Sequence, residues 1–121
     1  MTSLKNQRFF VRLRFAIAGF VHCFRAERSL RTQVFALLSV VIALLILRPA
    51  PIWWALAILA SVVTLAAELF NAALEKLADH LHPQLHPQIR IVKDYAAAAV
   101  LCVALGATCI AIALVVEIFR H

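Results

Sequence analysis

Three long apolar stretches dominate the chain, and each has the length of a membrane-spanning helix. They are expected at about residues 28–47, 52–80 and 93–119. Each would cross roughly 30 Å of hydrocarbon at 1.5 Å per residue. Pro49 and Pro51 end the first stretch, and Pro83 and Pro87 follow the second, because proline does not continue a helix. The pattern therefore predicts three spans joined by two short connections.

A basic amphipathic stretch precedes the first span, at about residues 6–26. Seven of the 12 basic residues of the chain lie in or beside it: Lys5, Arg8, Arg12, Arg14, Arg25, Arg28 and Arg31. A basic block can bind nucleic acid. Here the arginines are interleaved with phenylalanines beside apolar spans, which is more typical of a helix lying on an anionic membrane surface. We therefore expect a surface helix and no nucleic-acid partner.

The composition is that of a membrane protein. The chain has 121 residues, of which 64% are hydrophobic, and its mean hydropathy is +0.93. About half apolar residues is usual for a soluble domain. At this length we expect one domain over residues 1–121. The predicted fold class is an all-α integral membrane protein with three transmembrane helices and an N-terminal surface helix, and its helices and loops must carry any chemistry.

The distribution of basic residues also predicts an orientation. Lysines and arginines gather on the cytoplasmic side of membrane proteins, and only Arg48 and Arg120 would lie opposite the others. We therefore expect a bacterial cytoplasmic (inner) membrane protein with a cytoplasmic N-terminus. Five of the six acidic residues then lie near the cytoplasm, where ATP is available: Glu27, Glu68, Glu75, Asp79 and Asp94. Glu117 lies elsewhere.

Polar side chains interrupt the second apolar stretch in the run AAELFNAALEKLAD. Glu68, Asn71 and Glu75 are three and four residues apart, so they share one helical face, and Asp79 continues it. A carboxylate at the bilayer centre costs about 2.5 kcal/mol or more. One explanation is a helix that leaves the bilayer, with its acids in water. The other is a metal and phosphate site at the membrane surface.

These side chains suit phosphoryl transfer. Mg²⁺ binds one or two carboxylates together with phosphate oxygens, and Glu27 and Glu75 could supply them. Lys93 could neutralise phosphate charge, and Glu68 could accept the proton of an attacking hydroxyl. The sequence contains neither a Walker A motif nor GxGxxG. The kinase and ATPase folds of soluble proteins are therefore excluded.

Other candidate ligands are weaker. The histidines at 80, 82 and 86 have spacings found in zinc sites, but Pro83 and Pro87 interrupt them, so a polar turn is the alternative. Cys102 and Cys109 lie seven residues apart in an apolar stretch and are expected to be small buried hydrophobic side chains.

The run AELFNAALEKLAD, followed by HPQIRIVKDYAAAAVL, resembles the core of the prokaryotic membrane diacylglycerol kinase family, which also contains undecaprenol kinase. The family pattern is similar to E-x-x-N-x-A-x-E and a later K-D. It is matched here by Glu68, Asn71, Ala73, Glu75, Lys93 and Asp94. Upstream, AERSLR resembles a glutamate–arginine element and contributes Glu27 and Arg31.

The resemblance implies a homotrimer that uses MgATP to phosphorylate a lipid hydroxyl. Diacylglycerol, giving phosphatidic acid, is the expected substrate, and undecaprenol, giving undecaprenyl phosphate, is the alternative. By resemblance Glu68 is the catalytic base, and Glu27 and Glu75 are the metal ligands. The implied nucleotide contacts are Arg8, Phe15, Glu27, Glu75, Gln84, Leu85, His86, Lys93 and Asp94. The implied lipid contacts are Arg8, Arg31, Glu68, Asn71 and Ala97.

Some positions depart from the family pattern. Phe15 lacks the hydroxyl of a tyrosine, Ala72 and Ala97 stand where some members have serine, and Gln33 replaces an acid. Small residues at 66–67, 72–73 and 96–99 leave room for a lipid, with the entrance expected at Ala97 and Ala98. Two further functions stay open: a non-catalytic membrane assembly protein, and a proton or ion transporter subunit that uses Glu68.

Overall fold

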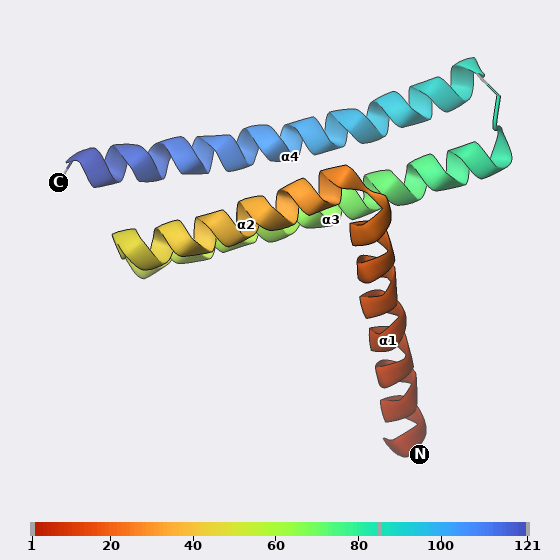
Figure 1. Cartoon of the computed structure of the whole chain (residues 1–121), viewed down its shortest axis with the longest axis horizontal. Coiled ribbons are helices and arrows are strands. Elements are labelled where there is room, and N and C mark those ends of the chain that lie inside the picture. Colours follow the sequence, from red (N-terminus) through yellow and green to blue (C-terminus); the bar gives the residue numbers. More distant parts are fainter. Residues whose placement is uncertain (1, 85, 121) are drawn as a thin grey trace.

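The computed structural model describes residues 2–84 and 86–120, which form four helices (Figure 1). These are α1 (Thr2–Ala26), α2 (Arg28–Leu47), α3 (Pro51–Leu81) and α4 (Pro87–Arg120). The last three are long and apolar enough to cross a membrane. No strand occurs in the described ranges. The predicted all-α fold, with three apolar helices after an N-terminal one, is confirmed.

The chain turns sharply between α1 and α2, so that α1 stands almost perpendicular to the other helices (Figure 1). The turn is made at Glu27, whose backbone is extended with φ −112° and ψ 118°. Arg31 fixes it, because its Nη1 donates to the carbonyl oxygens of Phe24 at 2.9 Å and Arg25 at 2.8 Å. Those carbonyls end α1 and have no partner within the helix. Leu30, one residue before Arg31, is fully buried, with 0% exposure.

A tighter turn joins α2 to α3 at the opposite end. Arg48 ends α2 in the left-handed conformation, with φ 48° and ψ 55°, and its backbone N–H donates to the Leu44 carbonyl at 2.9 Å. Pro51 then begins α3, where proline's missing N–H is tolerated. Trp53 and Trp54 follow in the first turn, as expected at a membrane interface.

The central helix is α3, which packs against both α2 and α4 and also meets α1. The three spans differ in length: they contain 20, 31 and 34 residues, or about 30, 46 and 51 Å. Only α2 matches the hydrocarbon thickness of about 30 Å. The hairpin between α3 and α4 therefore extends well past the corner where α1 meets α2 (Figure 1).

One helix boundary differs clearly from the prediction. The third span was expected to begin near Lys93, but α4 begins at Pro87. Proline fits the first turn of a helix, where its fixed φ is suitable and no N–H is needed. Pro87 therefore starts a helix instead of breaking one. As a result Arg90 and Lys93 lie on the first two turns of α4, not in a loop.

Few side chains are buried in a single chain, as expected for helices that face lipid or a partner. The buried apolar residues are Leu30, Leu44, Ala57, Ala78 and Ala96. The prediction that Cys102 and Cys109 are buried is wrong for the single chain, because both are exposed on α4. The reason is that, among the described elements, α4 packs only against α3.

Candidate active site at the membrane surface

Glu68 is the most deeply buried charged residue of the described chain, with 7% exposure. It lies on α3 one turn after Thr64, which is also buried at 6%. Thr64 satisfies its own hydroxyl by donating to the Ala60 carbonyl at 2.7 Å. Glu68 has no hydrogen bond or ion pair with any other described side chain. Its carboxylate oxygens are not among the buried unpartnered atoms, so they reach the surface of this chain. A carboxylate in an apolar helix is costly and usually functional, so Glu68 is a candidate for function.

Asn71 and Glu75 share a face of α3, as their spacing predicts. The Nδ2 of Asn71 donates to Oε1 of Glu75 at 3.4 Å. The Oδ1 of Asn71 is buried and has no partner in the described residues. A buried amide oxygen usually accepts a hydrogen bond. Glu75 thus orients the amide of Asn71 and leaves its Oδ1 without a partner, which makes Asn71 a candidate for binding a ligand.

Asn71 also lines an apolar cavity of about 320 Å³ between α3 and α4. Its lining includes the small residues Ala66, Ala67, Ala96 and Ala99. The expected lipid entrance at Ala97 and Ala98 is not found there: both are exposed and neither lines this cavity. On α4 the residues that face α3 are 96 and 99, because helical neighbours are three or four residues apart.

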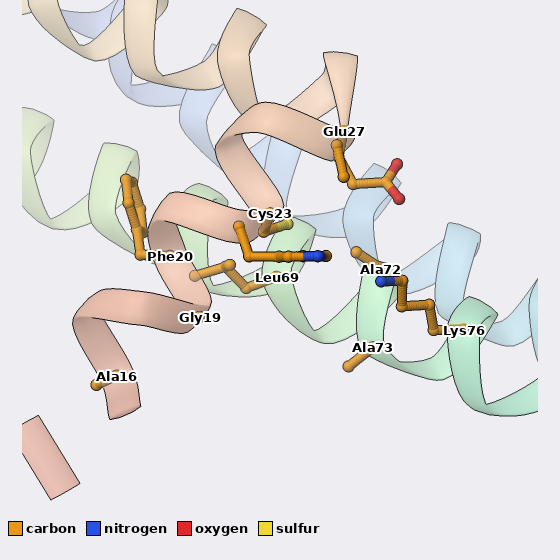
Figure 2. A pocket seen from close by; sticks show the side chains of 11 residues that line it. Ala16, Gly19, Phe20, Cys23, Glu27, Leu69, Ala72, Ala73 and Lys76 are labelled. Atoms are coloured by element: carbon orange, nitrogen blue, oxygen red, sulfur yellow. The ribbon is translucent and has the colours of Figure 1, made fainter. Parts of the chain in front are cut away.

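The largest cavity, of about 580 Å³, lies between α1 and α3 (Figure 2). Its walls are mostly apolar, with Ala16, Gly19, Phe20, Cys23 and Ala26 from α1 and Leu69, Ala72 and Ala73 from α3. Three polar residues also line it: His22, Glu27 and Lys76. Sequence reasoning did not single out Lys76. The signal was present, since residues 69, 72, 73 and 76 form one helical stripe.

Electrostatics tie Glu68 to this cavity. The pKa of the Cys23 thiol is raised, first by burial and then by the negative charge of Glu27, with a smaller contribution from Glu68. Lys76 opposes this shift. Glu27 and Lys76 both line this cavity. Glu68 does not line it and lies on α3 about two turns before Lys76.

A second, more polar cavity of about 210 Å³ lies at the projecting α3–α4 hairpin. Its lining residues are Asp79, His82, Pro83, Gln84, His86, Ile89, Arg90, Lys93 and Asp94. Four of the expected nucleotide contacts thus come together: Gln84, His86, Lys93 and Asp94. Leu85 lies outside the described residues.

Two pairs of side chains shape this polar cavity. Lys93 Nζ lies 2.6 Å from Asp79 Oδ1, so the expected phosphate clamp is held by a neighbouring carboxylate. The rings of His82 and His86 stack with centroids 5.2 Å apart. His86 Nδ1 accepts a hydrogen bond from the backbone N–H of Gln88 at 3.1 Å. This histidine arrangement fits the polar turn that was the alternative to a zinc site.

Other expected contacts are not brought together within one chain. Arg8 and Phe15 are exposed on α1, and Phe15 is 72% exposed. Arg8 lies roughly 28 Å from Glu27 along the axis of α1. The expected lipid contact Arg31 instead closes the α1–α2 corner through the carbonyls of Phe24 and Arg25. Glu27 lines the α1–α3 cavity, whereas Glu75 is not among its lining residues.

The donors present suit Mg²⁺. No group of three or more histidine, cysteine, aspartate or glutamate residues in the described chain is arranged to hold a metal by itself. Mg²⁺ requires less, since one or two carboxylates and the oxygens of a phosphate and of water complete its shell. Glu27, Glu75 and the unpartnered Oδ1 of Asn71 are all hard oxygen donors. These donors are of the kind that the ion prefers, but within one chain Glu27 lines the α1–α3 cavity and Glu75 does not, so the two carboxylates are not brought together there.

Comparisons with known proteins show the family of this chain. Residues 14–115 match the model of the family described as prokaryotic diacylglycerol kinase. The chain is also 36% identical over 98 residues to a protein of Synechocystis sp. named diacylglycerol kinase. That match covers 80% of this chain and 56% of the relative, so the chain spans little more than half of the relative's length. The family match includes every cavity-lining acid of the corner and the hairpin, and the chain belongs to the prokaryotic diacylglycerol kinase family.

Proposed function

We propose that this chain is a lipid kinase that transfers the γ-phosphate of MgATP to the hydroxyl of a membrane lipid, with diacylglycerol as the expected acceptor. The observation that carries the proposal is Glu68. It is buried and unpartnered among the described residues, at the level where the surface helix meets the spans. The apolar length of α2 lies on one side of this level, and the α3–α4 hairpin, with its polar cavity, projects on the other. A lipid and a nucleotide can meet only at such a level.

The acid–base role follows from the position of Glu68. Its carboxylate accepts the proton of the lipid hydroxyl, and the hydroxyl oxygen forms a bond to the γ-phosphorus. The bond from that phosphorus to the bridging oxygen breaks, and ADP leaves. Asn71, held by Glu75, presents its unused Oδ1 one turn further along the helix. The lipid chains stay in the bilayer, so the reaction is mainly one of positioning.

The polar hairpin cavity is the proposed nucleotide site. Arg90 and Lys93 supply positive charge there, and Gln84, His86 and Asp94 supply polar contacts. Lys93 has to exchange Asp79 for a phosphate oxygen when ATP binds. Bound Mg²⁺ would neutralise charge on the phosphate oxygens, and Glu27 and Glu75 are the residues that would hold it.

We also propose the location and the assembly. The positive-inside rule places α1 and the hairpin on the cytoplasmic face of the bacterial inner membrane. Phe70, Leu74, Leu77 and Leu81 are exposed on α3, four and three residues apart. This stripe lies on the part of α3 that leads into the hairpin, and we expect its end to project beyond the bilayer. Packing between α3 helices of identical chains would bury it, which supports the expected homotrimer. Neighbouring copies could then supply Arg8 and Phe15 to a site.

A transfer assay tests the proposal. Purified protein in detergent micelles is given [γ-³²P]ATP and either dioctanoylglycerol or undecaprenol, and the extracted lipid is counted. We expect Mg²⁺-dependent label in phosphatidic acid. Label only in undecaprenyl phosphate would keep the lipid kinase and correct its substrate. Absence of label in both lipids, with folded and oligomeric protein, would contradict the proposed function and favour a non-catalytic assembly protein.

A further inference from the structure

The cavity between α1 and α3 has a feature that the proposed reaction leaves unused. Most of its wall is apolar and made of small side chains, but one side carries charge (Figure 2). Glu27 and Lys76 lie on that side, and His22 of α1 also lines the cavity. An apolar cavity with a few convergent polar groups is the usual form of a small-molecule site.

Lys76 is the cation of this site. In the described residues it forms no ion pair, whereas Lys93 is paired with Asp79. Its charge nevertheless reaches the cavity wall, because it lowers the pKa of Cys23 against the effects of burial, Glu27 and Glu68. Glu75, the preceding residue, points with Asn71 along another face of α3. Glu75 and Lys76, although adjacent in sequence, therefore lie on different faces of α3.

We propose that Lys76 binds the phosphate of the phosphorylated lipid product, whose glycerol and upper chains occupy the α1–α3 cavity. This inference rests on the proposed function, since it names where its product is held. Glu27 repels a phosphate, so an anionic group can enter this side of the cavity only beside a cation. Lys76 supplies that cation, as a compact charge with three donors.

The apolar lining of the cavity, and its position beside the surface helix, favour a lipid over a nucleotide as its ligand. The lining residues Phe20 and Leu69 and the alanines around them offer apolar surface at the depth of the surface helix. The polar contacts suited to a nucleotide lie in the separate hairpin cavity. The unphosphorylated lipid carries a neutral hydroxyl and gains little from an ammonium group. Lys76 therefore distinguishes product from substrate.

Protection of Cys23 from alkylation tests this directly, because Cys23 lines the same cavity. The exposed thiols Cys102 and Cys109 are first replaced by alanine. Alkylation of Cys23 by N-ethylmaleimide is then followed by mass spectrometry without ATP, so the test does not depend on turnover. The probes are dioctanoyl phosphatidic acid, dioctanoylglycerol, glycerol 3-phosphate and ATP. We expect phosphatidic acid to protect at about tenfold lower concentration than dioctanoylglycerol, as for a charge-assisted hydrogen bond.

Variants assign the difference to Lys76. Lys76→Gln should abolish the tenfold preference, Lys76→Arg should keep most of it, and Arg12→Gln, on the exposed part of α1, should leave it unchanged. Equal protection by the two lipids in the wild type would overturn the proposal, as would an unchanged preference in Lys76→Gln. Protection by glycerol 3-phosphate alone would show a free-phosphate site, and protection by ATP would assign the cavity to the nucleotide. A failed transfer assay with intact protection would instead refute only the proposed reaction.

Discussion

The two ends of this helical bundle carry similar residue types and differ in what surrounds them. At the far end the chain turns tightly through Arg48 and Pro49, and Glu117 is the one acid placed there. At the α1 end α3 and α4 continue beyond the corner (Figure 1). Two cavities with charged residues in their linings lie at this end. A carboxylate near a membrane surface is therefore not a site by itself. It becomes one where extra helix length and a surface helix enclose space around it.

The comparison also concerns the space that small side chains leave. Between α3 and α4, which run alongside each other, alanines line a cavity of about 320 Å³. Between α1 and α3 the same residue type, at Ala16, Ala72 and Ala73, lines a larger cavity of about 580 Å³. The difference comes from direction, because α1 crosses the bundle almost at a right angle and touches it only near its own end (Figure 1). Perpendicular helices cannot close the space along their lengths.

Replacing one glutamate at each end gives the largest expected contrast. Glu68→Gln should lower kcat by about 10²–10⁴-fold, because an amide cannot accept the hydroxyl proton. Glu117→Gln, the matched change at the far end of α4, should leave kcat near the wild-type value. Initial rates at saturating ATP and lipid, with gel filtration as a check of assembly, provide the measurement. Near-normal turnover of Glu68→Gln would remove it as the base.

Replacing the carboxylates proposed to bind the metal should have the next largest effect. Glu27→Ala and Glu75→Ala should each raise the Mg²⁺ concentration for half-maximal activity by about tenfold or more, because too few anionic oxygens remain. A Mg²⁺ titration at fixed ATP measures this, with Glu117→Gln as the control. If both variants titrate like the wild type, this pair does not hold the ion.

The two residues of the Lys93–Asp79 ion pair should differ in their effects on ATP binding. Lys93→Met should raise KM for ATP by about tenfold through the loss of a charge-assisted contact. Asp79→Asn should not raise it, and should change stability by less than about 1 kcal/mol, since the Lys93–Asp79 pair is substantially exposed. Steady-state kinetics measures KM for ATP in both variants, and thermal unfolding measures their stability. Equal damage by both substitutions would mean that Asp79 itself contacts nucleotide or metal.

The smallest expected effect concerns the thiol of Cys23. Its raised pKa keeps the thiol protonated, so alkylation should be slower than for a free cysteine at the same pH and should accelerate as pH rises. Glu27→Gln removes a raising charge and should speed alkylation at pH 8 a few-fold. Lys76→Gln removes a lowering charge and should slow it. Rates measured in the Cys102→Ala and Cys109→Ala background test this order, and the reverse order would show that the corner is arranged differently.

Much of the fold follows from local patterns, which is why it was predictable from sequence. The apolar stretches set the spans, and the prolines at 49 and 51 set the first turn. The start of α4 was missed because Pro87 can either end a helix or begin one. The predicted burial of Cys102 and Cys109 was also wrong. The sequence of an apolar helix does not show which of its faces contact protein and which contact lipid.

The site was predictable only in its single-helix part. The pairing of Asn71 with Glu75 follows from a spacing of four residues. The contact of Lys93 with Asp79 depends on the register of α4 against α3, which no local pattern provides. The role of Arg31 at the corner and the presence of Lys76 in the α1–α3 cavity depend on the direction of α1. Such relations between helices appear only once the helices are placed.

The central claim is that chemistry occurs at the α1 end alone, and sealed vesicles test it most directly. Protein that retains only Cys23 is reconstituted with unequal orientation, together with diacylglycerol. One aliquot is labelled with a membrane-impermeant maleimide, and another receives external [γ-³²P]MgATP, each before and after detergent. The account predicts that the fraction of kinase activity available from outside equals the fraction of Cys23 labelled from outside. An activity fraction equal to the unlabelled remainder would place the reaction at the Glu117 end and contradict the account.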